Sequence, residues 1–271
     1  MPFQSSELSI RLGVVQYLNT KPLVHAFETG ELEHPFELVY DVPSECARKL
    51  HGGETDVAII PAIEIARAPE PYSVVRGVAI GSAGPVNSVF LVLNDRAPGD
   101  ITSVALDTSS RSSVALTRIL LEKRFGVSPQ AIDHPPDIDW MLEAADAAVL
   151  IGDPALELDR DRYEVLDLGA AWTEWTGLPF VYACWTGRAG TLNADARDLL
   201  VAARALGLAQ VDAIAADYAA ARSFPPEFYA AYLAGSLHFD FGDKEMEGLL
   251  RFLSYAAELN LIRAVPPIGF Y

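Results

Sequence analysis

The sequence has 271 residues, of which 51% are hydrophobic and 21% are charged, a composition typical of a folded globular protein rather than a disordered one. Its formal net charge of −17 would repel nucleic acids and anionic membranes, because both are bound through surfaces dense in lysine and arginine. We therefore expect neither as a partner. A small anionic substrate is still compatible with this charge, since exposed charges are screened beyond about 8 Å at physiological salt.

The N-terminal segment and the cysteines predict a cytoplasmic protein. Residues 1–10 contain no positive charge, no apolar stretch of signal-peptide length and no small-residue cleavage site. No later run reaches the roughly 18 apolar residues of a membrane span. Cys46 and Cys184 lie far apart and form no CxxC pair, which favours reduced, buried thiols.

The first part of the chain predicts alternating strands and helices. A strand at 9–15 leads into a polar loop at 16–21, and Pro22 stands where a helix can begin. The elements expected next are a strand at 36–40, a short helix at 43–50, and strands at 56–60, 72–76, 79–81 and 88–93.

A polar run with glycine and proline at 94–100 predicts a crossover to a second series of elements. This series contains a strand at 103–107, an amphipathic helix at 111–125 and a buried strand at 147–151. A return strand at 180–186 and the glycines of 187–190 predict a second crossover, and the chain from Asn193 onward is expected to be helical.

This pattern predicts an α/β protein of two lobes with a central cleft. Residues 1–94 and 187–271 are expected to form the first lobe and residues 95–186 the second. Ligands of open α/β sheets bind beyond the carboxyl ends of the strands, so we expect the site in the cleft between the lobes.

Several common site chemistries lack their sequence signatures. No two of the five histidines have the spacing typical of zinc ligands. The chain also contains no GxGxxG, GxxxxGK[ST] or GxSxG motif, which are the marks of dinucleotide sites, P-loops and hydrolase nucleophile elbows. We therefore predict no metal site, no dinucleotide or P-loop nucleotide site, and no hydrolase nucleophile elbow.

The segment 107–113 places an arginine where the start of a helix disfavours a positive charge. Ser109 or Ser110 is a natural N-cap for the helix that follows, and capping alone is one interpretation. Arg111 would then lie in the first helical turn, where the helix dipole disfavours a cation by up to about 1 kcal/mol. A bound anion removes this conflict, because backbone N–H groups, serine hydroxyls and one guanidinium would converge on it. We favour this second interpretation and predict an anion site, although the motif alone does not name the anion.

Other polar residues are expected near the cleft. Asn19 follows the first strand, where a loop residue faces the cleft, although a turn or cap role ahead of Pro22 fits equally well. Ser88 borders a Gly-Pro loop that turn formation alone explains. Asp153 precedes a proline, as helix N-caps do, and a capped loop at a cleft can also touch ligand. Thr176 is expected as a secondary lining residue.

Five motifs occur in order along the chain, at 17–19, 84–89, 107–114, 145–156 and 176–181. The first reads Tyr-Leu-Asn, and the third contains Ser-Ser-Arg-Ser-Ser. Together they resemble the chorismate dehydratases of the futalosine route to menaquinone, and five ordered motifs are far more specific than any one of them. One departure is Ser112, where a threonine is expected in the family; both residues keep the hydroxyl.

The resemblance implies a type II periplasmic-binding-protein-like fold and the dehydration of chorismate to 3-(1-carboxyvinyloxy)benzoate, without metal or organic cofactor. It also places the family's asparagine, which acts in proton removal, at Asn19. Chorismate carries two carboxylates, which suits a helix start bearing Arg111. We predict Asn19 as the catalytic residue, with substrate contacts from Tyr17, Ser44, Ser88, Ser109, Ser110, Arg111, Ser112, Asp153 and Thr176.

Two other functions remain open from the sequence. The sister enzyme of the same pathway, which makes 1,4-dihydroxy-6-naphthoate, shares the fold but depends on a histidine, and His134 in its proline-rich stretch is no convincing counterpart. A non-catalytic binding protein for a small carboxylate would be expected to carry an export signal or an output domain, and neither is visible. The sequence does not predict the oligomeric state.

Overall fold

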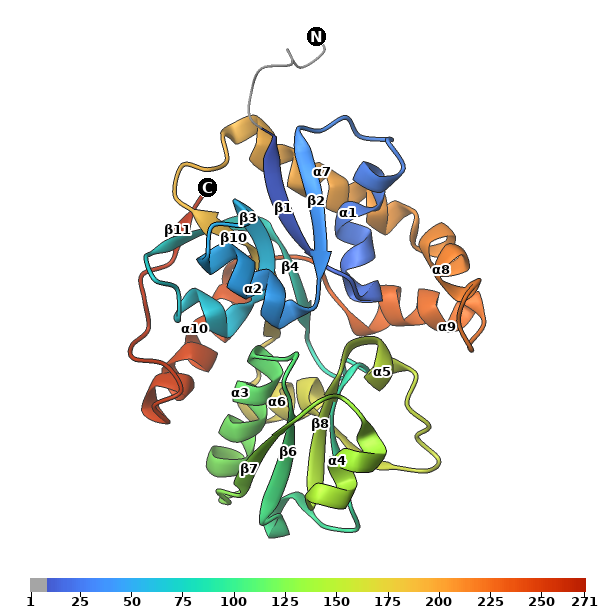
Figure 1. Cartoon of the computed structure of the whole chain (residues 1–271), viewed down its shortest axis with the longest axis vertical. Helices are drawn as coiled ribbons and strands as arrows, with labels where there is room; N and C mark the ends of the chain where they lie inside the picture. Colours follow the sequence, from blue (N-terminus) through green and yellow to red (C-terminus); the bar gives the residue numbers. More distant parts are fainter. Residues whose placement is uncertain (1–8) are drawn as a thin grey trace.

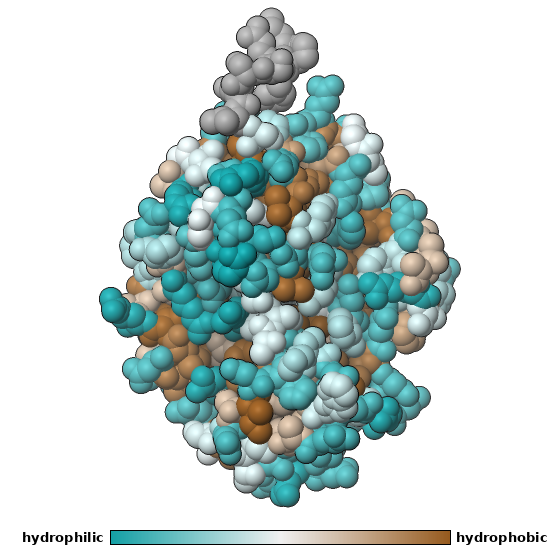
Figure 2. Space-filling view, viewed as in Figure 1, coloured by the Kyte–Doolittle hydropathy of each residue, from teal (hydrophilic) through white to brown (hydrophobic). Residues whose placement is uncertain are grey.

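The structure is a computed structural model that describes residues 9–271; most of the N-terminal segment used above to predict the compartment lies outside this range. Figure 1 shows two lobes arranged along the long axis of the molecule, each built on its own sheet and flanked by helices. The visible face in Figure 2 is largely hydrophilic, with apolar residues in small separate areas.

The first lobe contains the six-stranded sheet, in the order β11-β4-β10-β3-β1-β2. Its strands are β1 (Ile10–Val15), β2 (Phe36–Asp41), β3 (Val57–Pro61), β4 (Tyr72–Ser82), β10 (Phe180–Arg188) and β11 (Gly269–Phe270). Its helices are α1 (Lys21–Glu28), α2 (Pro43–His51), α7 (Ala194–Ala209), α8 (Val211–Ala219), α9 (Pro226–Ala231) and α10 (Asp243–Glu258). Short turns at Leu18–Thr20, Ala62–Ile65 and Tyr232–Ser236 complete the lobe.

The second lobe contains the five-stranded sheet, in the order β7-β6-β8-β5-β9. Its strands are β5 (Val89–Leu93), β6 (Ser103–Asp107), β7 (Gln130–His134), β8 (Ala147–Ile151) and β9 (Glu164–Asp167). Its helices are α3 (Ser112–Ile119), which continues as a π turn to Arg124, α4 (Ile138–Ala144), α5 (Gly152–Leu156) and α6 (Leu168–Thr176), with a short turn at Pro98–Asp100.

The predicted elements are confirmed where an apolar run is bounded by turn residues. Strands β3, β5 and β8 are buried at every position, as expected for strands of a sheet that is covered on both faces. The two strands predicted at 72–76 and 79–81 form one long strand, β4. Strands β7 and β9 and helices α4 and α6 were not predicted, because their sequences are short or mostly exposed and carry a weak periodic signal.

The predicted lobe boundaries are wrong at both crossovers. Strand β5 pairs antiparallel with β8 and β9 in the second sheet, so the first crossover precedes it and spans 83–88. Strand β10 pairs antiparallel with β3 and β4 in the first sheet, so the second crossover also precedes its strand, at 177–179. A buried apolar strand has the same composition in either lobe, and only its hydrogen-bonded partners decide where it belongs.

The start of helix α1 is held by a close helix contact. Helix α7 packs against α1, and a Cβ at Gly207 would overlap the carbonyl of Pro22. The absence of a side chain at Gly207 thus permits the backbones of α7 and α1 to approach closely at Pro22, just after the loop that contains Asn19. This contact fixes one side of the loop between β1 and α1.

Asp146, in the motif at 145–156, ties the starts of β6 and β8 together. Its carboxylate accepts hydrogen bonds from the N–H (2.8 Å) and hydroxyl (2.6 Å) of Thr102 and from the N–H of Ser103 (3.1 Å). These bonds, those of Thr102 first, lower the pKa of Asp146 from 3.8 to about 2. The motif residue therefore has a structural role.

We expect Asp146→Asn to lower the free energy of unfolding at pH 7, with the deficit shrinking as pH falls from 3.8 through 2. The sign follows because a carboxyl whose pKa is depressed by folding contributes stability above its unfolded pKa and loses it on protonation. Urea unfolding of both proteins between pH 2 and 7 measures the difference. A deficit of equal size at both ends of this range would contradict the assignment.

Within residues 9–271, no single helix has the length and apolar character needed to cross a membrane, and one pair, α7 with α8, meets those criteria together but is bent by 73°.

Candidate active site between the lobes

A cavity lies between the lobes, with about 550 Å³ of empty space that includes the part open to solvent. Its lining comes from both sides. The lining residues are Val15, Tyr17, Asn19, Pro43, Pro61, Ile80, Tyr182, Ala183 and Leu237 from the first lobe, Val89, Ser110, Arg111, Ser112, Ser113, Ile151 and Gly152 from the second, and Val86 and Ser88 from the crossover between them. Most follow the carboxyl end of a strand or open a helix, so the cleft is where the topology predicted it.

Hydroxyl groups dominate the polar lining. Among the described residues that surround the cavity, Arg111 is the single charged one, and none is a carboxylate, histidine, lysine or cysteine. The local charge is therefore opposite in sign to that of the whole chain. Such a lining can bind an anion but offers no strong base of its own.

The start of helix α3 presents three buried serines to the cavity. Ser110, Ser112 and Ser113 are each at most 5% exposed, and no side chain caps the helix. The first N–H groups of a helix lack intrahelical partners, and the dipole makes them a good environment for an anion. The N–H groups and serine hydroxyls at this helix start are the kinds of donor that an anion site requires.

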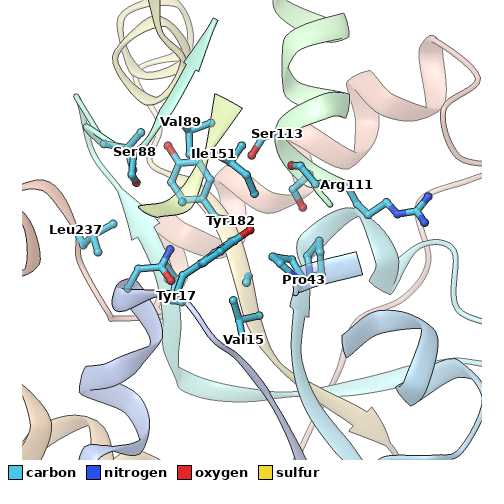
Figure 3. Close-up of a pocket in the computed structure, with 18 residues that line it drawn as sticks. Val15, Tyr17, Pro43, Ser88, Val89, Arg111, Ser113, Ile151, Tyr182 and Leu237 are labelled. Atoms are coloured by element: carbon cyan, nitrogen blue, oxygen red, sulfur yellow. The ribbon is translucent and has the colours of Figure 1, made fainter. Parts of the chain in front are cut away.

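Arg111 is the N-cap of α3, which corrects the prediction of Ser109 or Ser110 at that position. Residue 111 has φ −125° and ψ −53°, so the helix begins one or two residues later than expected. The side chain is exposed, and Figure 3 shows its guanidinium extending away from Tyr17 and Tyr182. No hydrogen bond or ion pair holds this side chain within the described chain, so it is free to turn toward a ligand.

Asn19 lies on the 3-10 turn that follows β1, with its Oδ1 accepting a hydrogen bond from the Thr20 hydroxyl at 3.3 Å. The phenol of Tyr232 is hydrogen bonded to the Ser88 hydroxyl at 2.8 Å. Burial raises the pKa of Tyr232, and hydrogen bonds with the side chains of Ser88 and Asn19 act in the opposite direction. Asn19, Ser88 and a neutral Tyr232 therefore form one polar group at the cavity wall.

Tyr17 lies against the backbone of Gly152 across the lobe boundary. Gly152 has φ +65°, and a Cβ there would come within 2.7 Å of the Tyr17 ring, so glycine meets both requirements. Burial raises the pKa of Tyr17, a hydrogen bond with the Ser109 side chain opposes this, and the carboxylates of Asp107 and Asp153 add to it. The phenol stays protonated at the cavity surface.

Ser44 and Ser109 do not line the cavity but join the lobes. The N–H of Ser44, in the first turn of α2, donates to the carbonyl of Ser109 at 3.1 Å. Ser109 in turn donates its N–H and hydroxyl to Oδ1 of Asp107, at 2.8 and 2.7 Å. Asp107 is 1% exposed, and burial raises its pKa. Ser109 thus connects a buried carboxylate to the opposite lobe.

Thr176 lies away from the cavity and closes helix α6. Its hydroxyl donates to the carbonyl of Trp172 at 2.8 Å and accepts from the N–H of Leu178 at 3.2 Å. Gly177 follows in the left-handed conformation with φ +72°, a common helix end. The secondary lining role predicted for Thr176 is thus not seen in this structure.

Asp153 is neither the predicted N-cap nor a lining residue. Helix α5 begins at Gly152 with Ile151 as its N-cap, and no side chain caps it. The Asp153 carboxylate points instead to the first lobe, where it accepts hydrogen bonds from the N–H of Leu18 and the hydroxyl of Tyr218. The sequence indicated that Asp153 lies near the boundary between the lobes, but not that its side chain bonds to the first lobe.

Tyr182 lines the cavity and Tyr232 is hydrogen bonded to the lining residue Ser88, and neither was predicted as a site residue. Both are almost fully buried, and Tyr182 is hydrogen bonded to Ser82 at 3.0 Å. An aromatic residue in a buried strand or helix is more often core than lining, so its presence carries no signal of a site. Within the described part of the chain, no group of three or more His, Cys, Asp or Glu residues could hold a metal ion.

A family model described as menaquinone biosynthesis matches residues 10–258, which is most of the chain. The protein belongs to this menaquinone-biosynthesis family. The resemblance stated from the five motifs is thereby confirmed, and the matched region contains every residue that lines the cavity.

Two curated relatives of this family member are named chorismate dehydratase. The Thermus thermophilus protein is 29% identical over 194 residues, covering 65% of this chain and 69% of the relative. The Campylobacter jejuni protein is 32% identical over 176 residues, covering 63% of this chain and 64% of the relative. The match to the second thus spans just under two thirds of that relative's length.

Solved structures show the fold. An Archaeoglobus fulgidus protein superposes with a TM-score of 0.76 at 18% identity, covering 95% of this chain and 100% of that one. The periplasmic aliphatic sulphonate-binding protein of Escherichia coli superposes with a TM-score of 0.66 at 17% identity, covering 98% and 94%. The predicted periplasmic-binding-protein-like fold is confirmed.

Proposed function

We propose that this protein is a chorismate dehydratase, a lyase that converts chorismate to 3-(1-carboxyvinyloxy)benzoate and water in menaquinone biosynthesis. The observation that carries the proposal is the placement of Asn19 and the serine-rich start of α3 on one cavity, in a chain whose curated relatives bear that name. Chorismate is a dicarboxylate, and the single charged lining residue is an arginine.

The reaction removes the C3 proton and the C4 hydroxyl, and the new C3–C4 double bond completes an aromatic ring. Because aromatisation drives this step, the protein needs chiefly to orient the substrate and to manage one proton. One carboxylate of chorismate is assigned to the N–H groups of α3 and the hydroxyls of Ser110, Ser112 and Ser113. Arg111, turned inward, would complete this anion site.

The base in this proposal is not a charged side chain of the protein. The described residues around the cavity include no carboxylate, histidine or lysine, and a neutral amide such as that of Asn19 is a poor base. A water molecule or the enolpyruvyl carboxylate of the substrate itself must therefore accept the C3 proton. Asn19, held by Thr20 and next to Tyr232, orients this acceptor or the departing hydroxyl.

The direct test is to incubate the purified protein with chorismate and follow the product by mass spectrometry and proton NMR. We expect stoichiometric loss of one water and the appearance of aromatic protons. Tight binding of chorismate without conversion would show that the protein is a binding protein for a small carboxylate rather than an enzyme. If the protein neither binds nor converts chorismate, the result would favour the sister reaction that makes 1,4-dihydroxy-6-naphthoate.

A further inference from the structure

Asp153 carries out a task that its position in the sequence does not suggest. It lies in helix α5 of the second lobe, which Figure 1 shows at the end of that lobe facing the first. The residue is 7% exposed. Its Oδ1 accepts the N–H of Leu18 at 3.0 Å, and its Oδ2 accepts the hydroxyl of Tyr218 at 2.6 Å. Both partners belong to the first lobe.

The bond to Leu18 falls on the turn that carries Asn19. Leu18 opens the 3-10 helix Leu18–Thr20, and no residue of the turn itself caps it, because Tyr17 makes no side-chain cap bond. The first N–H groups of such a turn have no partner within it, and Leu18 is fully buried from solvent. The carboxylate of Asp153 therefore supplies from the opposite lobe the acceptor that this N–H requires.

The surroundings of Asp153 hold the carboxylate in place from the far side. Tyr218, on α8, donates its hydroxyl, and the guanidinium of Arg222 lies 3.6 Å from Oδ2 and 4.7 Å from the ring centroid of Tyr218. Burial raises the pKa of Asp153, while the bonds from Tyr218 and Leu18 and the charge of Arg222 oppose it. One oxygen thus faces the Asn19 turn and the other faces this support.

We propose that Asp153 is a positioning residue that couples lobe closure to catalysis by fixing the Asn19 turn of the first lobe to the second lobe. Asn19 and the start of α3 lie on different lobes, so their distance depends on closure. The bond between Asp153 and Leu18 forms only when the lobes meet. This bond fixes the backbone position of Leu18, the residue directly before Asn19. The side-chain amide of Asn19 is therefore ordered only when the lobes are closed.

This proposal rests on the proposed function, and a neighbouring contact provides a matched control. Tyr229, on α9, donates its hydroxyl to Oε1 of Glu157 at 2.6 Å, directly after the end of α5. This is the same kind of bond, between a tyrosine of the first lobe and a carboxylate of the second. Neither residue is hydrogen bonded to the turn Leu18–Thr20. The ring of Tyr229 packs edge-on against that of Tyr218, and phenylalanine at position 229 keeps this packing, so the variant removes the hydroxyl alone.

The experiment compares Asp153→Ala, Asp153→Asn, Tyr218→Phe and Tyr229→Phe with the parent protein in steady-state dehydration of chorismate. We expect Asp153→Ala to lower kcat about ten- to a hundredfold with a smaller change in KM, as loss of one charge-assisted bond predicts. Asp153→Asn, which keeps an acceptor for Leu18, should recover most of kcat. Tyr218→Phe should fall between them, and Tyr229→Phe should retain parental kcat.

Amide hydrogen exchange gives a readout that does not depend on the reaction. We expect Asp153→Ala to speed exchange in the segment 17–20, and Tyr229→Phe to leave that segment unchanged. The proposal would be overturned if Tyr218→Phe and Tyr229→Phe lost kcat equally. It would also be overturned if exchange at 17–20 were unaltered in all three of Asp153→Ala, Asp153→Asn and Tyr218→Phe. If the parent protein does not convert chorismate, the proposed function fails, and the exchange comparison alone decides whether Asp153 orders the turn.

Discussion

Asn19→Ala is expected to lower kcat for chorismate by about a hundred- to ten-thousandfold, the range typical of losing one group that positions a proton transfer. Asn19 contributes the one amide side chain among the described lining residues, and no neighbouring carboxylate or histidine can replace it. The loss should appear in kcat, with only a modest change in substrate binding, because the anion site belongs to the other lobe. Steady-state kinetics and calorimetric binding of chorismate measure the two effects separately.

A matched control for this variant is Asn94→Ala. Asn94 lies at the far end of the second lobe, where its amide donates to the carbonyl of Leu142 at 3.0 Å. Removing it deletes the same chemical group without touching the cavity, so kcat should stay at the parental value. Parental activity in Asn19→Ala would exclude a role for Asn19 in the reaction and would remove the main residue-level argument for a dehydratase.

Arg111→Ala is expected to raise KM about ten- to a hundredfold, with a smaller effect on kcat. The change corresponds to losing a charge-assisted, two-pronged contact with a carboxylate, worth about 1.5–3 kcal/mol. In the absence of ligand the guanidinium extends away from the neighbouring side chains, so its removal should leave the free protein as stable as before. Initial-rate kinetics and thermal unfolding test both parts.

Arg118→Ala is the control for Arg111. Arg118 is an exposed arginine in the last turn of the same helix and does not line the cavity, so its removal changes the net charge equally. Arg111→Lys should lie between parent and alanine variant, because lysine keeps the charge but not the planar fork. An unchanged KM in Arg111→Ala would assign the carboxylate to the N–H groups and hydroxyls of α3 alone.

The site could be predicted from the sequence as far as its chemistry is local. Asn19, Ser110 and Ser112 follow strand ends or open a helix, and these positions face a cleft in any fold of this type. The anion-binding interpretation of the segment at 107–113 depends on the serines, on Arg111 and on the helix that follows, all of which are neighbours in the sequence. Those features survive in the structure, although the cap falls at Arg111.

The contacts between lobes could not be predicted in the same way. Ser44 and Ser109 meet through backbone atoms, and nothing in their side chains indicates this pairing. Asp153 has the sequence context of an N-cap, and its actual partners, Leu18 and Tyr218, lie 135 and 65 residues away. A hydrogen bond between residues so far apart in the sequence depends on how the lobes pack, and lobe packing produces no recognisable pattern in the sequence around Asp153.

Residue type and short-range order account for the alternation of strands and helices, the absence of common cofactor motifs and the five motifs that identify the family, so all three could be predicted from the sequence. The tertiary structure decided which sheet receives β5 and β10, where the crossovers lie and what the carboxylate of Asp153 contacts. Buried apolar strands are interchangeable in composition, and a buried polar group takes its partner from whatever packing brings near.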